Sequence, residues 1–269
     1  MALWLAALLG LIQGLTEFIP VSSNAHLRIA SALLRQGDTG AAYTAVIQLG
    51  TLAAVLAYFA KDLVNLAGAM VRQPDSPEGR LPLLLVAGTV PIVIVGLLLK
   101  KQVEGDLRSL YVVAGALIVV GILMILVDRH AAGRVGRGIA TLTLRDAVLI
   151  GVAQSLALVP GVSRSGATIC MALMLGLARS DAARFSFLLS IPAIAGAGIL
   201  EARTAFVGLG SSAIPALVTG IGVAAVVGYA SIAWFLSWLG SHDLVGFAVY
   251  RIIAGLAVLA AIAANIVSA

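Results

Sequence analysis

The sequence predicts an all-α polytopic membrane protein, and three observations support this fold class. Hydrophobic residues make up 61% of the 269 residues, and charged residues make up only 11%. A soluble domain carries about 25% charged residues, so this chain is too apolar to fold in water. The apolar residues fall into long runs, and the 29 glycines suit membrane helices that pack closely through small residues.

The apolar runs divide the chain into ten expected helical segments. Four are short and come in two pairs, each broken by a proline and serines, so we predict two re-entrant helix hairpins that turn inside the membrane. The other six are predicted to be transmembrane, because a crossing helix needs about 20 residues. The hairpins are 2–19 with 22–35 and 143–159 with 163–177, and the six crossings are 40–60, 81–100, 108–128, 182–203, 213–239 and 245–267. The stretch 72–80 is interpreted as a polar loop, and residues 1–269 as one integral membrane domain.

The two hairpins are similar in sequence. At an offset of 141 residues, GLIQGLTEFIPVSSNA lies over GVAQSLALVPGVSRSG, so that Ser22 matches Ser163. Both halves, 1–130 and 143–269, have the order short, short, long, long, long. Three crossings per half is an odd number, so the second half starts from the opposite face. This pattern predicts an inverted-topology repeat, in which broken helices form the functional site near the bilayer midplane.

Loop charges indicate the orientation of the chain. Lysines and arginines are more frequent on the face that carries the loops near 61–80 and 129–145, so this face is predicted to be cytoplasmic. Both termini and the first hairpin then face outside. The N-terminal run lacks a positive segment and a cleavage site, and we expect it to be mature structure rather than a signal peptide.

Composition also bears on partners. No run of basic residues suggests nucleic-acid binding, and the single cysteine, Cys170, excludes an intrachain disulfide and a cysteine-based metal site. Small residues could support either a homodimer face or internal packing, an alternative that stays open. They include Gly115, Gly121, Gly220 and Gly228.

Two charged residues lie within the apolar hairpins rather than at their ends, Glu17 and Arg164. Either one alone in hydrocarbon would cost several kcal/mol, so each needs a partner or a wet pocket. The repeat brings both to the hairpin tips, where we expect them to meet. Helical spacing of four places further polar groups beside them. These pairs are Gln13 with Glu17, Ser22 with His26, and Arg164 with Thr168.

The serines after each proline predict anion-binding helix starts. Ser22 or Ser23 can cap the helix that begins near Asn24, and Ser163 can cap the helix that begins near Arg164. Two helix starts and an arginine facing one cavity favour a phosphate or diphosphate ligand. A serine, a histidine and a carboxylate beside that ligand suggest phosphoryl transfer.

Structural alternatives remain for each of these residues. Glu17 and Arg164 could be a buried ion pair without a catalytic role, and His26 could be a hydrogen-bonded core residue. The serines Ser22, Ser23, Ser163 and Ser165 could be simple caps, and Thr168 could bond to its own helix. Arg251 could pair with Glu201 or Asp243, or reach the pocket.

Two motifs together resemble a known family. QGLTEFIPVSSNAH resembles the (E/Q)xxxE…PVSSxxH block, and PGVSRSGAT the PGxSRSxxT block, of the bacterial undecaprenyl-diphosphate phosphatases, the bacitracin-resistance family. The resemblance covers the whole chain. It implies a multi-pass hydrolase of the bacterial inner (cytoplasmic) membrane, reached from the outer (periplasmic) face. Such an enzyme removes the terminal phosphate of an isoprenyl diphosphate lipid and returns the monophosphate carrier to cell-wall synthesis.

The resemblance also implies roles for single residues and a divalent cation, magnesium or calcium. In our hypothesis Arg164 holds the diphosphate, Ser23 attacks the terminal phosphorus or positions a water, and His26 exchanges the proton. Glu17 orients His26 or holds the cation. Attack by His26, which would form a phosphohistidine, is an alternative to attack by Ser23. Gln13, which replaces a glutamate of some relatives, is predicted to bind substrate with Ser22, Ser163, Ser165 and Thr168. A transporter or flippase for an anion or lipid phosphate is the alternative function.

Overall fold

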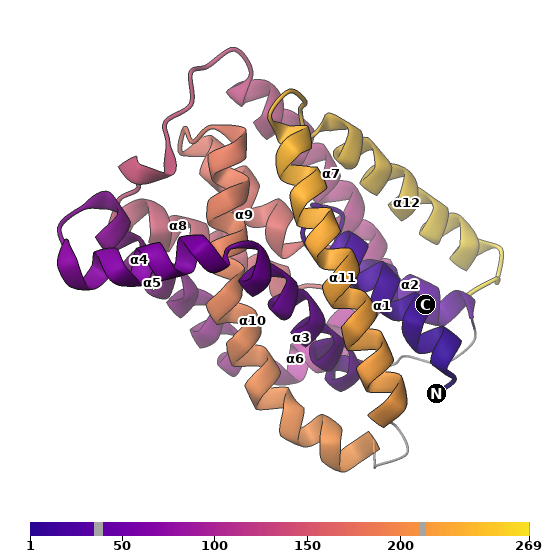
Figure 1. The fold of residues 1–269 in the computed structure, drawn as a ribbon. Coiled ribbons are helices and arrows are strands. Elements are labelled where there is room, and N and C mark those ends of the chain that lie inside the picture. Colours follow the sequence, from indigo (N-terminus) through magenta and orange to yellow (C-terminus); the bar gives the residue numbers. More distant parts are fainter. Residues whose placement is uncertain (35–39, 210–213, 269) are drawn as a thin grey trace.

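The computed structural model describes residues 1–34, 40–209 and 214–268, and the described chain is a bundle of helices (Figure 1). Its α-helices are α1 (Leu3–Thr16), α2 (Ser23–Leu33), α3 (Gly40–Tyr58), α4 (Ala60–Arg72), α5 (Pro77–Leu98), α6 (Lys100–Glu104), α7 (Leu110–Ala131), α8 (Leu144–Ser155), α9 (Arg164–Met174), α10 (Arg179–Leu209), α11 (Ile214–Leu239) and α12 (Val245–Ala263). Short 3-10 turns lie at Asp106–Arg108, Ile139–Thr141 and Leu156–Leu158.

Each of the ten predicted segments contains a helix, but the count of ten is wrong. The described residues hold two more helices, α4 and the short α6. Helix α4 was missed because Lys61, Asp62 and Arg72 give it a polar face and end the apolar run at residue 60. The loop predicted over 72–80 is correspondingly shorter, since Ser76 caps α5 by accepting a hydrogen bond from the backbone N–H of Gly79 at 3.0 Å.

The chain is a multi-pass membrane protein. Among the described residues, four helices are long and apolar enough to cross a bilayer, namely α5, α7, α11 and α12. A fifth crossing is present if α3 and α4, which meet at an angle of 69°, form one broken span. The bend lies at Phe59, so the predicted crossing over 40–60 corresponds to α3 and ends at the first residue of α4.

Two glycine contacts bring short helices against long ones in matching ways. Helix α1 packs along α11, and helix α8 packs along α5. A Cβ built on Gly10 would lie 2.4 Å from the carbonyl oxygen of Gly220, and a Cβ built on Gly151 would lie 2.2 Å from that of Gly88. Gly10 and Gly151 are 141 positions apart, the same offset that relates the two hairpins. Only glycine allows backbones to approach this closely.

Helices α7 and α12 pack against each other in an equally reciprocal way, and they lie side by side in Figure 1. A Cβ on Gly121 of α7 would lie 2.9 Å from the oxygen of Ala248, and one on Gly255 of α12 would lie 2.8 Å from the oxygen of Ala114. Gly121 thus serves internal packing, as do Gly220 and Gly228, which meet Tyr43 and Ala54 respectively. A Cβ on Gly115 meets no atom within 4 Å, so this glycine leaves room for a neighbouring helix.

An aromatic cluster lies directly beneath the end of α1. Phe18 is 1% exposed and packs edge-on against Phe187 of α10, with ring centroids 5.2 Å apart. Phe187 in turn lies 6.0 Å from the ring of Phe235 on α11. Because edge-to-face aromatic pairs fix the orientation of their rings, this cluster holds the end of α1, and hence the neighbouring Glu17, at a defined height in the bundle.

The loop before α8 is held by a capping box and an ion pair. The hydroxyl of Thr143 accepts from the backbone N–H of Asp146, whose carboxylate accepts from the backbone N–H of Thr143. Arg137 lies 2.9 Å from the same carboxylate. Burial alone would raise the pKa of Asp146, but the hydrogen bonds from Thr143 and Arg137 outweigh burial and hold that pKa below its ordinary value.

Candidate active site

Two chain elbows of the same unusual conformation form the centre of the site. Ser22, before α2, has φ 77°, and Ser163, before α9, has φ 74°. Non-glycine residues rarely adopt positive φ, and such strain concentrates at functional sites. Ser163 accepts a hydrogen bond from the N–H of Gly166 at 3.1 Å, as a helix cap does. Ser22 makes no such bond, so the expected cap by Ser22 is wrong, and α2 already begins at Ser23.

Glu17 is the hub of the polar network between the elbows. Its carboxylate is buried and accepts from the Ser23 hydroxyl at 2.5 Å, from the Gln13 amide at 2.8 Å and from the Arg164 guanidinium at 2.6 Å. Bonds of this length to an ionised carboxylate are charge-assisted and among the stronger hydrogen bonds in proteins. The bond to Arg164 joins residues 147 positions apart, so Glu17 links the two hairpins directly.

Arg164 stands at the first residue of α9 and reaches across to α1. Besides Glu17, its guanidinium donates to the carbonyl oxygen of Ser190 on α10 at 3.1 Å. The side chains of Arg164 and Glu17 are 13% and 5% exposed, so the pair is nearly removed from solvent. The expected meeting of the acid and the guanidinium is present in the structure.

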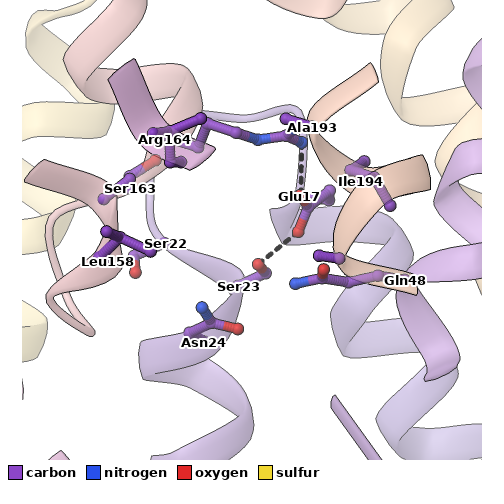
Figure 2. A pocket seen from close by; sticks show the side chains of 13 residues that line it. Glu17, Ser22, Ser23, Asn24, Gln48, Leu158, Ser163, Arg164, Ala193 and Ile194 are labelled. Carbon is purple, nitrogen blue, oxygen red and sulfur yellow. Dashed lines mark hydrogen bonds and ion pairs between the residues drawn. The ribbon is translucent and has the colours of Figure 1, made fainter. Parts of the chain in front are cut away.

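A cavity of about 160 Å³ opens between these side chains (Figure 2). A volume of this size exceeds the roughly 10–15 Å³ that one water requires, so it has room for water or a small anionic group. In Figure 2 Glu17 stands between Arg164 and Ser23, with an interaction drawn to each. The lining residues come from both hairpins and from α3, α5 and α10: Glu17, Ser22, Ser23, Asn24, Gln48, Ile92, Ala157, Leu158, Ser163, Arg164, Ala193, Ile194 and Ala197.

Three further predicted residues lie behind the cavity wall. Ser165 lies 3.1 Å from Ser163 and donates weakly, at 3.4 Å, to the carbonyl oxygen of Glu17, so it ties α9 to the first hairpin. Thr168 donates to the carbonyl of Arg164 at 2.8 Å and lies 2.6 Å from the hydroxyl of Ser186. Gln13 and Thr168 are buried and do not line the cavity, so they contact it only through Glu17 and Arg164.

His26 lies apart from this cluster. Its Nδ1 is 2.8 Å from the carbonyl oxygen of Ser22, and its Nε2 is 2.7 Å from the hydroxyl of Tyr250 on α12. The imidazole stacks on the Tyr250 ring, with centroids 5.6 Å apart. It lines an apolar groove between α2, α7 and α12 rather than the cavity of Glu17. The expected contact between Glu17 and His26 is therefore not found among the described residues.

Comparison with known proteins decides the family of the chain. The family model described as bacitracin resistance protein BacA matches residues 6–257. The chain belongs to the BacA family. BacA relatives include the undecaprenyl-diphosphatase of Prosthecochloris aestuarii, which is 44% identical over the full length of both chains. The undecaprenyl-diphosphatase of Myxococcus xanthus is 48% identical over 96% of this chain and 89% of the relative. That of Mycolicibacterium gilvum is 46% identical over 99% of each chain. The resemblance stated from the two motifs is confirmed.

In this BacA-family chain, several residues of the site were not singled out from sequence. Gln48 lines the cavity from α3, and its carbonyl accepts from Thr51, whose hydroxyl lies 3.4 Å from the Gln13 amide. Asn24 lines the cavity, and its Oδ1 is buried without a hydrogen-bond partner in the described part of the chain. A polar pair at helical spacing within the apolar run 40–60 was the available signal for Gln48 and Thr51. Ser186 and Ser190, four apart on α10, gave the same signal.

Proposed function

We propose that this chain hydrolyses undecaprenyl diphosphate to undecaprenyl phosphate and inorganic phosphate, as the names of its relatives state for them. One observation carries the proposal. A carboxylate, Glu17, holds a serine hydroxyl at 2.5 Å and a guanidinium at 2.6 Å beside a cavity lined by both polar and apolar side chains. These are a base, a nucleophile and a phosphate clamp within one hydrogen-bonded cluster.

The chemistry follows from this cluster. Arg164 and the N–H groups at the start of α9 bind the diphosphate, because a guanidinium and a helix N-terminus both favour phosphate oxygens. The Ser23 oxygen attacks the terminal phosphorus while its proton passes to Glu17, and the bond to the bridging oxygen breaks. Undecaprenyl phosphate leaves with the electron pair of that bond. Glu17 passes this proton to the departing undecaprenyl phosphate and is ionised again. A water then attacks the phosphoseryl group and gives a proton to Glu17, which returns it to the Ser23 oxygen as the bond between that oxygen and phosphorus breaks. Phosphate is released and the serine hydroxyl is regenerated.

Two alternatives for the attacking group remain as outcomes of experiment. A water could be positioned by Ser23 and attack directly, or His26 could form a phosphohistidine. The present geometry favours Ser23 over His26, because Nε2 of His26 faces Tyr250 and the imidazole does not line the cavity. In this proposal His26 supports catalysis by holding the carbonyl of the strained Ser22.

The residues of the cavity also fit a divalent cation, magnesium or calcium. Among the described residues, no group of three histidine, cysteine, aspartate or glutamate side chains could hold a metal alone. Magnesium, however, is commonly bound by one or two carboxylates together with substrate phosphates. Glu17 and the partnerless Oδ1 of Asn24 would hold it with the diphosphate. When bound, the cation would neutralise charge on the phosphate oxygens.

We further propose that the chain is an inverted-topology repeat of 1–130 and 143–269, with two re-entrant hairpins and six crossings. The matched φ angles of Ser22 and Ser163 and the matched glycine contacts of α1 and α8 support this proposal. The loop charges support a cytoplasmic membrane location with the basic loops inside. The site would then open to the periplasmic face, where the diphosphate lipid is released from polymer export.

Phosphate release from undecaprenyl diphosphate in detergent tests the proposal, with and without a chelator. We expect release by the wild type and its loss in Glu17→Gln, Ser23→Ala and Arg164→Met. Ser31→Ala is the matched control, because Ser31 is a buried serine on the same helix as Ser23, and its hydroxyl has no hydrogen-bond partner among the described residues. If the wild-type protein moves lipid phosphate across the membrane of vesicles but releases no phosphate, the phosphatase proposal is wrong and the transporter function takes its place.

The chemical stability of a trapped adduct separates the nucleophiles. After brief reaction with lipid labelled in its terminal phosphate, a phosphoserine withstands acid whereas a phosphohistidine is lost in acid. We expect an acid-stable label that disappears in Ser23→Ala. A label that is acid-labile and depends on His26 would assign the attack to the imidazole, and no label at any time would assign it to water.

A further inference from the structure

Arg251 of α12 binds both elbows of the site at once. Its side chain is fully buried, at 0% exposure. Nη1 donates to the carbonyl oxygen of Pro20 at 2.8 Å, and Nη2 donates to those of Gly161 and Val162 at 2.6 and 3.0 Å. Pro20 and Gly161 are 141 positions apart, so they occupy the same place in the two hairpins. One guanidinium therefore holds equivalent carbonyls of both turns.

These carbonyls need a donor. Each elbow interrupts a helix inside an apolar bundle, so its carbonyl oxygens lose the N–H partners that a continuous helix would supply. A buried polar group without a partner costs about 1–3 kcal/mol. The planar fork of an arginine can satisfy several acceptors in a fixed geometry, which a lysine ammonium cannot do across two separate turns.

The charge of Arg251 is not balanced by a carboxylate among the described side chains. The partners of its guanidinium are neutral carbonyls, and its Nε has no hydrogen-bond partner in the part of the chain that the structure describes. In contrast, Arg164 is paired with Glu17. The region around the elbows thus holds two guanidinium groups and one carboxylate, an excess of positive charge that favours an anionic ligand. Intramembrane charges of this kind are expensive and are typically functional.

The repeat shows that packing alone does not require an arginine here. Helices α7 and α12 correspond to each other, because Gly121 meets Ala248 just as Gly255 meets Ala114. An offset of 134 positions relates these pairs, and at this offset Leu117 of α7 occupies the position equivalent to Arg251 of α12. Leu117 is likewise fully buried, but it is apolar. One half of the fold fills this position with a leucine, and only the other half supplies a cation.

We propose that Arg251 is a positioning residue for phosphoryl transfer. By fixing the separation of the two elbows, it places Ser23, three residues after Pro20, and Arg164, two residues after Val162, around one cavity. This inference rests on the proposed function for its kinetic test, but the positioning itself can be measured without substrate.

The test uses Arg251→Met and Arg251→Lys in the full-length protein in detergent. For Arg251→Met we expect kcat to fall at least about a hundredfold with a smaller change in KM, because alignment rather than substrate capture is lost. Hydrogen exchange of backbone amides, followed by mass spectrometry, should accelerate at both elbows, 19–24 and 159–166, and not at the α5–α8 contact. For Arg251→Lys we expect no more than about a tenth of the wild-type kcat, because lysine restores the positive charge but not the planar set of donors that binds both turns.

A control on the same helix separates positioning from stability. Ile262→Ala removes a buried side chain of α12 that packs with Leu110 and Ala114 on α7, far along the helix from the elbows. It should lower thermal stability while kcat and elbow exchange stay near wild type. If Arg251→Met does not accumulate as folded protein, kcat and hydrogen exchange are both measured on Arg251→Lys.

Three results would overturn the proposal. These are Arg251→Met turnover within about threefold of wild type, full recovery of kcat by Arg251→Lys, and lost turnover with unchanged exchange at both elbows. A wild-type protein that releases no phosphate would refute the proposed function instead, and the exchange comparison would still decide whether Arg251 holds the turns.

Discussion

The ion pair between Glu17 and Arg164 makes a quantitative prediction for stability. In Arg164→Met the carboxylate of Glu17, 5% exposed, keeps only neutral donors. In Glu17→Gln the guanidinium of Arg164, 13% exposed, keeps only the carbonyl of Ser190 as a strong partner. Breaking a buried pair by removing one partner costs about 3–5 kcal/mol. We expect each single variant to lose a free energy of unfolding in this range.

The double variant should lose much less than the sum of the two singles. It buries no unpaired charge, and a methionine beside a glutamine amide can pack in the same space. Two residues in direct contact couple by up to about 3 kcal/mol, so the double variant should lose about 3 kcal/mol less than the sum of the two single losses. Equilibrium unfolding in mixed detergent micelles, followed by tryptophan fluorescence, measures all four proteins. None of the three variants should release phosphate, so a stability loss smaller than the sum of the singles, without recovered activity, would separate the two roles of the pair.

Additivity would contradict this reasoning. If the double variant loses the sum of the two single losses to within about 0.5 kcal/mol, the two side chains do not interact in the folded protein. The control cycle pairs Arg164→Met with Ser31→Ala, because Ser31 lies on α2 without a hydrogen-bond partner in the described chain. That cycle should be additive.

Three more predictions follow from single contacts. Ser23→Ala should lower phosphate release at least about a thousandfold, and turnover within tenfold of wild type would exclude Ser23 as nucleophile. Gly151→Ala should lower the unfolding free energy by about 1–3 kcal/mol, because its Cβ would lie 2.2 Å from the oxygen of Gly88, whereas Gly222→Ala, with open space, should be neutral. The lowered pKa of Asp146 means that its charge stabilises the fold above about pH 4 and that this stability is lost as pH falls through the folded-state pKa. Unfolding midpoints between pH 7 and pH 3 should therefore fall less for Asp146→Asn than for wild type, and parallel curves would refute the assignment.

Much of the fold could be predicted because lipid imposes strong constraints on sequence. Apolar runs located α5, α7, α11 and α12 to within a few residues, and the prolines located both elbows. Helix α4 escaped prediction because it is amphipathic, so that a scan for apolar length ends where its charged face begins. The bend of 69° between α3 and α4 could not be predicted, because the sequence near Phe59 contains no proline or glycine that would mark a break.

The sequence predicted the contact between charged residues of the site, but it did not predict the orientation of the other side chains. Glu17 and Arg164 meet because neither can be buried alone in hydrocarbon, a constraint that depends on composition only. His26 was placed on the Ser22 face by helical spacing, but its ring turns to Tyr250, whose position on α12 could not be known from spacing within α2. The contacts of Arg251 were likewise left open, because they depend on how three distant segments come together.

Glu17 and Arg164 belong to different hairpins. Each hairpin packs against a long helix of the other half of the chain, because α1 contacts α11 and α8 contacts α5. Any change in the tilt of those long helices must therefore shift Glu17 relative to Arg164. Helices tilt to match the hydrophobic thickness of the surrounding bilayer. We therefore expect the distance between Glu17 and Arg164 to depend on bilayer thickness, and turnover in vesicles to pass through an optimum as the acyl chains are lengthened.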